Sequence, residues 1–184
     1  MISIPLYSQY DARWASKPLG TSGNTMRSHG CYVTSITMIV NNYGYKVDPG
    51  QTCDALNAIN GFTPDGDVKW EAVMRIFPNV VWESRLSCWT TNFTLGANLA
   101  KVQQTEALRR LEKLVKRGMP TILCVDNVGN DKRPDHAIVL KNTNGRWLAN
   151  DPDGGIEVAL EAGHKYGPKE TAIYGLRAII GSPL

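Results

Sequence analysis

The stretch RSHGCYVTSITMIVNNYG, residues 27–44, places a cysteine directly after a glycine and directly before a helical pattern. Large side chains recur through it at helical spacing, at Tyr32, Ile36, Ile39 and Tyr43. Gly44 is typical of the position just after a helix end. The pattern predicts a helix that opens near His29-Gly30 and carries Cys31 in its first turn.

Three more helices are expected around this one. DPGQTCDALNAING, residues 48–61, has Asp48 as N-cap, Pro49 at the first helical position, Gln51 completing a capping box and Gly61 after the end. DVKWEAVMRIFP, residues 67–78, is a shorter candidate. TEALRRLEKLVKRGMP, residues 105–120, has an apolar face, basic residues in its last turn, and then Gly118 and Pro120.

Strand composition dominates the second half of the chain. The candidates are VVWESRLSCW (80–89), TILCVDNV (121–128), DHAIVLKN (135–142), RWLANDP (146–152) and AIYGLRAII (172–180), with a loop rich in glycine and charge before the last. Helices followed by strands predict an α+β fold, with N-terminal helices packed on a C-terminal antiparallel sheet. A chain of 184 residues with 42% hydrophobic residues is expected to form one domain, residues 1–184.

Composition narrows the possible partners. The net charge of +3 is small and scattered, without a basic stripe, so no nucleic-acid partner is expected. No apolar run reaches the ~18 residues of a membrane span, and the N-terminus has no signal-peptide pattern. A soluble protein, cytoplasmic by default, is expected. The four cysteines lie far apart without a C-x-x-C pair, which predicts free thiols.

Cys31 is the candidate nucleophile. The unpaired N–H groups and the dipole of a helix N-terminus favour a thiolate. Gly30 would leave room for a substrate backbone, and the Cys31 N–H could donate to an oxyanion. The alternative is a core residue, because free cysteine is among the most buried residue types.

A nucleophilic cysteine needs a base, and the chain has three histidines. His29 lies ahead of the helix, with its side chain expected to point away from the thiol. His164 lies in a polar loop. His136 opens a predicted strand directly after the polar loop DNVGNDKRPD, which suits a functional side chain on a rigid element.

The hairpin that follows His136 allows its partner to be counted. Asn144-Gly145 indicates a type I′ turn, which places Lys141 opposite Leu148, Val139 opposite Asn150 and Ile138 opposite Asp151. His136 and Asp151 then share a face as diagonal neighbours, with backbones roughly 7–8 Å apart. Asp153, directly across from His136, is the second candidate. Asp151 could equally serve only as the start of an Asp-Pro turn.

The blocks SQYDARW (8–14), LGTSGNTMRSHGCYVTSITMIVNNYG (19–44), DHAIVLKN and NDPDG (150–154) together resemble the C39-like group of papain-fold cysteine peptidases in a stand-alone form. The resemblance runs from Pro5 to about Gly155 and implies the papain-like form of the α+β fold. It implies Cys31 as nucleophile, His136 as general base, Asp151 as the residue that orients the imidazole, and Gln9 as an oxyanion-hole donor. It implies no cofactor.

The resemblance implies a hydrolase that cleaves a peptide or amide bond through a Cys-His-Asp triad. The best-known members are exporter domains that trim leader peptides, whereas stand-alone relatives occur among cell-wall-directed and phage-borne proteins. A bacterial cell-wall peptide or a protein tail is therefore the expected substrate, and a released or phage-associated protein is an alternative to a cytoplasmic one. The rival readings are a catalytically silent binding module, an acyltransferase or amidase on the same fold, and a metal site built from His29, Cys31 and His136.

Overall fold

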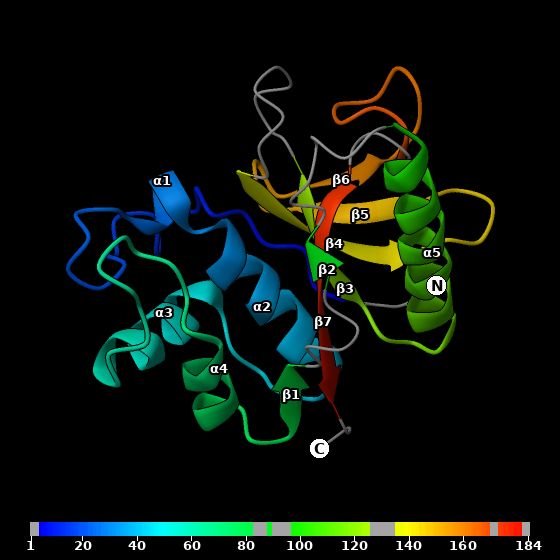
Figure 1. Ribbon diagram of the computed structural model, residues 1–184. Helices are drawn as coiled ribbons and strands as arrows, with labels where there is room; N and C mark the ends of the chain where they lie inside the picture. Colours follow the sequence, from blue (N-terminus) through cyan, green and yellow to red (C-terminus); the bar gives the residue numbers. More distant parts are fainter. Residues whose placement is uncertain (1–3, 83–87, 90–96, 126–134, 170–172, 182–184) are drawn as a thin grey trace.

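The computed structural model describes residues 4–82, 88–89, 97–125, 135–169 and 173–181, and its central element is α2 (Cys31–Asn42). This helix runs between a layer of helices and an antiparallel sheet (Figure 1). Nine of its residues are buried, including the polar Thr34, Ser35 and Thr37, because it has neighbours on several sides. The helix expected to open near His29-Gly30 is confirmed as α2. A short helix that was not expected, α1 (Met26–His29), precedes it and ends at Gly30.

The helical layer contains α3 (Pro49–Ala58) and α4 (Trp70–Ile76) beside α2. The N-terminus of α3 is built as expected, since the Asp48 side chain accepts from the Gln51 N–H and the Gln51 side chain accepts from the Asp48 N–H. α4 is shorter than the expected range 67–78. Its predicted first turn is instead extended, because Val68 forms an isolated β-bridge with Phe62.

The described strands form one antiparallel sheet in the order β1-β7-β3-β4-β5-β6, with β2 also paired to β7. Their bounds are β1 (Val80–Trp82), β2 (Cys88–Trp89), β3 (Thr121–Val125), β4 (His136–Asn142), β5 (Leu148–Asp151), β6 (Ile156–Ala159) and β7 (Ile173–Gly181). The α+β class with helices packed on an antiparallel sheet is thereby confirmed. Within the described ranges, no helix combines the length and apolarity that crossing a bilayer requires.

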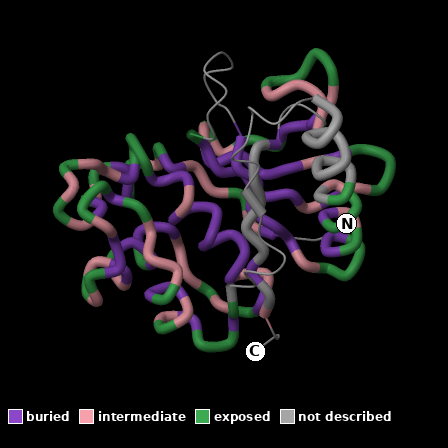
Figure 2. Tube along the Cα trace, in the orientation of Figure 1, coloured by how far each residue is buried: buried purple, intermediate pink, exposed green. Residues whose placement is uncertain are grey.

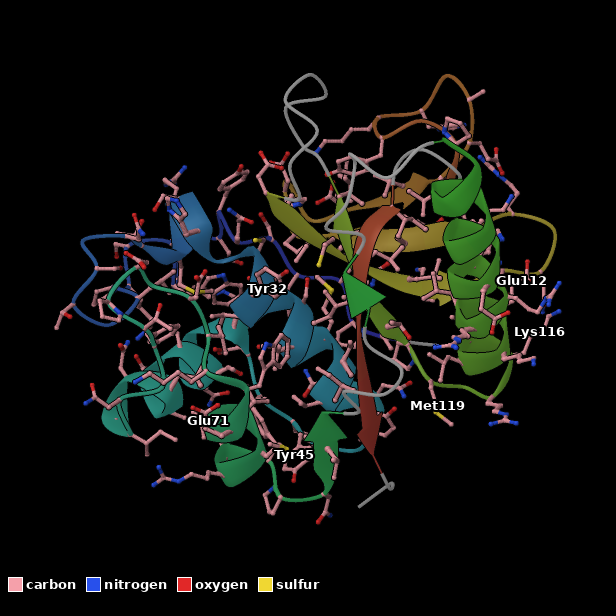
Figure 3. The ribbon with its side chains drawn as sticks, in the orientation of Figure 1. Tyr32, Tyr45, Glu71, Glu112, Lys116 and Met119 are labelled. Carbon is pink, nitrogen blue, oxygen red and sulfur yellow. The ribbon has the colours of Figure 1, made fainter. Side chains whose placement is uncertain are left out.

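Each face of the sheet has its own core. In β4, Ala137 and Val139 join the core around α2, while Ile138 and Leu140 join the core beneath α5 (Ala97–Lys116). This alternation follows from the two-residue period of a strand. The buried segments of Figure 2 accordingly lie on both sides of the sheet, and Glu112 and Lys116 lie on the side of α5 away from it in Figure 3. α5 begins at Ala97, earlier than the expected residue 105.

The hairpin β4–β5 has the predicted register at the end that matters for the site. Val139 lies opposite Asn150, and Leu140 lies opposite Ala149. Near the turn the expectation is wrong, because Asn142 and not Lys141 pairs with Leu148. A register shift between Leu140 and Asn142 inserts one extra residue on the β4 side and absorbs the difference.

Other differences lie in the strands that the sequence pattern described poorly. β6 occupies part of the glycine-rich segment that was expected to be a loop. Residues 80–89 contribute β1 and β2, while residues 83–87 of that expected strand lie outside the described residues. The expected strand 121–128 is seen as β3, and its residues 126–128 also lie outside them.

Candidate active site

Cys31 is the first residue of α2, and the break at Gly30 shapes its surroundings. The helical hydrogen bonds are interrupted there: the Gly30 N–H bonds to Met26 O, and the next such bond runs from the Thr34 N–H to Gly30 O. A Cβ at Gly30 would lie 2.3 Å from Met26 O, so only glycine fits. The α1–α2 junction thus has its own steric requirement for glycine, and the expectation that Gly30 makes room for a substrate stays a prediction.

The sheet supplies His136, which contacts Cys31, and Asp151, which contacts His136. His136 opens β4 and Asp151 ends β5, and the imidazole Nε2 lies 2.7 Å from Asp151 Oδ1. Both side chains are buried, at 5% and 0% exposure. The Cys31 thiol interacts with the same imidazole. Because Nε2 is engaged by Asp151, the ring atom that faces the sulfur is Nδ1.

Asp151 is held from several directions. Its Oδ1 also accepts from the Asp153 N–H at 2.8 Å, and its Oδ2 accepts from Lys165 Nζ at 2.9 Å and from the Tyr166 hydroxyl at 2.7 Å. Burial by itself would raise the pKa of Asp151, but the hydrogen bonds from His136, Tyr166 and Lys165 lower it. Asp151 is therefore an ionised carboxylate inside the protein.

Asp151, and not Asp153, is the carboxylate that contacts His136. Asp153 instead pairs with Lys165 and with the hydroxyl of Tyr10. That contact with Asp153, together with burial, raises the pKa of Tyr10 to about 12. Asn150 lies on the other face, where its Nδ2 donates to Pro5 O at 3.1 Å.

The charge of His136 follows from these contacts. Burial alone would lower the pKa of His136, yet the hydrogen bonds with Asp151 and with Cys31 outweigh it and raise the pKa from 6.5 to about 9. The imidazole is therefore protonated at neutral pH. An imidazolium beside a thiol at a helix N-terminus is an arrangement that favours a thiolate.

Gln9 is brought to the same place from the N-terminal segment. It is 4% exposed, its backbone N–H donates to Pro152 O at 2.9 Å, and its Nε2 donates to Arg27 O at 2.9 Å. Arg27 O is the carbonyl that the Cys31 N–H would use if α1 and α2 were one helix. Gln9 takes this carbonyl, and within the described ranges no other acceptor contacts the Cys31 N–H or the second N–H of the Gln9 amide.

A pocket of about 440 Å³ opens onto these groups. Its lining residues come from four parts of the chain and include three carboxylates; they are Gln9, Tyr10, Ser28, His29, Cys31, Tyr32, Asp65, Gly66, Asp67, Val68, Asp135 and His136. The pocket thus contains the sulfur, the imidazole and the Gln9 side chain together. A small molecule or an extended peptide in it would meet all three.

Several residues near Cys31 and Asp151 were not proposed as site residues from the sequence. Tyr10, which the sequence did not single out, is 39% exposed at the pocket. Lys165 and Tyr166 belong to a loop, and no periodicity or motif indicates that this loop turns back onto Asp151. His29 lines the same pocket, and the direction of its side chain relative to the thiol stays a prediction.

The remaining cysteines and histidine lie elsewhere. Cys53 and Cys124 are buried, and burial raises the pKa of Cys53 to about 11. Cys88 lies in β2. His164 lies on the surface beside Arg146, at 3.4 Å. Among the residues that the structure describes, no group of three or more histidine, cysteine or acidic side chains is placed to hold a metal ion.

Comparison with known proteins places this arrangement in a family. The sequence model of the Peptidase_C39 like family matches residues 1–162. A crystal structure from Bacillus anthracis, provisionally described as a C39-like peptidase, covers 85% of this chain and 90% of its own, with 14% identity and a TM-score of 0.47. That likeness is too weak to carry an argument, and no curated protein matches the sequence. The family match spans most of the chain, and the chain therefore belongs to the C39-like peptidase family.

Proposed function

We propose that the protein is a cysteine peptidase or amidase in which Cys31 is the nucleophile, His136 the acid and base, and Asp151 the residue that orients His136. The observation that carries the proposal is one pocket that opens onto the Cys31 thiol and the His136 imidazole while Asp151 holds the far side of the ring. Acyl transfer through a thiol needs a nucleophile that is hydrogen-bonded to a base, and a third group that orients the base.

Acylation starts from the thiolate–imidazolium pair. The Cys31 sulfur forms a bond to the substrate carbonyl carbon, and the carbonyl π electrons move to oxygen. The second N–H of Gln9 and the Cys31 N–H donate to this oxyanion. When the oxyanion collapses, the C–N bond breaks and the proton on His136 Nδ1 passes to the leaving amine. A thioester and a neutral imidazole remain.

Deacylation uses the same groups in reverse. The neutral His136 removes a proton from water, the resulting hydroxide attacks the thioester carbon, and the same N–H groups stabilise the second oxyanion. Collapse releases the carboxylic acid and returns the sulfur as a thiolate beside the imidazolium. Throughout, the Asp151 carboxylate keeps the Nε2–H tautomer of His136, which directs Nδ1 at the sulfur.

The substrate class proposed is a peptide, whether a protein tail or a peptide of the bacterial cell wall. It rests on the family and on the pocket volume, about 440 Å³, which accommodates a few residues of extended chain. An amide other than a peptide bond would follow the same steps. An acyltransferase would differ only in that an amine, instead of water, resolves the thioester.

The test compares the reactivity of the cysteines and then turnover. Iodoacetamide at pH 6 should alkylate Cys31 rapidly, as read by peptide mass spectrometry, while the buried Cys53 and Cys124 remain unmodified. Turnover of a panel of peptide amides and murein stem peptides should be lost in Cys31→Ala and kept in Cys53→Ala, the matched control. Alkylation of Cys31 no faster than that of the other thiols would support a catalytically silent binding module instead.

A further inference from the structure

The loop between β6 and β7 folds back over the carboxylate that orients His136. It follows β6 in the orange part of Figure 1 and is tied at its base, where the Leu160 N–H donates to Trp147 O and the Lys169 N–H donates to Leu160 O, both within 3.1 Å. Two consecutive residues of this loop, Lys165 and Tyr166, reach Asp151 Oδ2. Both lie beyond residue 162, where the family match ends.

We propose that Lys165 and Tyr166 are positioning residues that set the proton affinity of His136 through Asp151. The proposal rests on the proposed function for its catalytic meaning, although the coupling itself can be measured without a substrate. Neither residue lines the pocket, so both act on the reaction through Asp151 and His136.

The first argument is the burial of Asp151. Its side chain is completely buried, and four donors fill the acceptor sites of its two oxygens, three of them from side chains. An ionised carboxylate in such a place needs a permanent counter-charge. His136 supplies one only while it is protonated. Lys165 supplies a charge in every step, so Asp151 stays ionised when His136 has given its proton to the leaving amine.

The second argument is geometric. The Tyr166 ring lies nearly parallel to the imidazole, with centroids 6.2 Å apart and planes 24° apart. Its hydroxyl donates to the same oxygen of Asp151 as Lys165 does. Tyr166 therefore limits both the plane of the His136 ring and the rotation of the carboxylate that holds it.

The third argument concerns the sign of the effect on His136. Three groups face its ring: the Cys31 thiol from α2, Asp151 from β5 and Tyr166 from the loop. Lys165, Asp153 and Tyr10 lie one contact further away. The pocket around the ring is also lined by Asp65, Asp67 and Asp135. His29 also lines the pocket, and Arg27 lies further out, 5.7 Å from the centroid of the Tyr10 ring. Among the described residues, Lys165 is the cation besides His136 that contacts Asp151. Its charge draws on the Asp151 carboxylate and so opposes protonation of His136. Asp153, which pairs with Lys165, acts in the opposite sense.

The test measures the titration of His136 directly. With ¹⁵N-labelled histidine, NMR follows the imidazoles from pH 5 to 11, and His29 serves as the internal reference. Lys165→Met should raise the midpoint of His136 by about half to one pH unit, since the lost charge is partly solvent-screened. Tyr166→Phe, which keeps the ring, should raise it less. Asp153→Asn should lower it.

Two control variants separate this coupling from a merely structural role. Lys165→Arg keeps the charge and should restore the native midpoint. Lys141→Met removes a lysine from β4 itself, where it pairs with Glu157, and should leave the midpoint of His136 unchanged. If Lys165→Met folds poorly, the near-isosteric Asp153→Asn decides the matter, because a loss of packing alone does not produce shifts of opposite sign.

An unchanged His136 midpoint in both Lys165→Met and Asp153→Asn would overturn the proposal, and so would shifts of the same sign. These results are independent of the catalytic assignment. A protein without hydrolase activity could still show the shifts, and an active enzyme without them would refute this inference alone.

Discussion

Asp151→Asn is the substitution that best tests the catalytic arrangement, because it removes the charge of the carboxylate with little change of shape. A pKa of His136 near 9 instead of 6.5 means that the folded protein favours the imidazolium by about 3 kcal/mol. Burial works against this preference, so it comes from the hydrogen bonds with Asp151 and Cys31 and from the negative charges of the same two groups. Loss of a contacting opposite charge typically changes a pKa by about 1–3 units.

We therefore expect the pKa of His136 to fall to about 7 in Asp151→Asn. At pH 8 the imidazolium fraction would drop from about nine-tenths to about one-tenth. The rate of any step that needs the imidazolium proton should fall about tenfold at that pH. The loss should remain smaller than in His136→Ala, since an orienting group is more replaceable than the acid and base itself.

The assay compares two alkylating reagents that differ in charge. Iodoacetate is anionic and is attracted by an imidazolium beside the sulfur, whereas iodoacetamide is neutral. The ratio of their rates at Cys31 should therefore fall as His136 loses its proton, near pH 9 in the native protein and near pH 7 in Asp151→Asn. Asp54→Asn on α3, which breaks an exposed pair with Lys17 of the N-terminal segment, is the matched control. A falling limb that stays near pH 9 in Asp151→Asn would refute the reasoning.

Three further outcomes are expected. Gln9→Ala should reduce kcat by about 10²- to 10³-fold while Cys31 remains fully alkylated, as is typical for the loss of one oxyanion donor; an unaffected kcat would remove Gln9 from the mechanism. Gly30→Ala should destabilise the fold by about 1–3 kcal/mol in urea denaturation, because its Cβ would meet Met26 O at 2.3 Å. The raised pKa of His136 makes its contribution to stability complete below about pH 6.5 and lost as pH rises through 9. Native protein should therefore lose up to about 3 kcal/mol relative to His136→Ala between pH 6 and 9.5, and parallel stability curves would contradict this.

Local sequence signals predicted those parts of the fold that depend on neighbouring residues. The N-terminus of α3 follows from Asp48, Pro49 and Gln51, whose capping contacts need only a few residues of chain. The pairing of Val139 with Asn150 was predicted by counting residues outward from the turn. The structure has this pair, and the register shift lies between it and the turn. The sequence did not predict β6, which is a short edge strand. Its first two residues, Ile156 and Glu157, are exposed, so buried and exposed residues do not alternate along it.

The short helix α1 shows the limit of periodicity. Its four residues contain one buried apolar side chain, Met26, and so they carry no helical period. At its end, Gln9 from another segment takes the carbonyl of Arg27. Competition of this kind between a local and a distant donor leaves no trace in a helical pattern.

By itself, then, the sequence determined the α+β class, the helix that begins at Cys31, and the strand end that places His136 near Asp151, since each depends on spacing within one element or one hairpin. The meeting of Cys31 with His136 was decided only by the packing of α2 against the sheet. Tertiary structure also decided that Asp151 is completely buried and held by Lys165 and Tyr166. A loop's path depends on the surface it packs against, and that surface exists only after the sheet has formed.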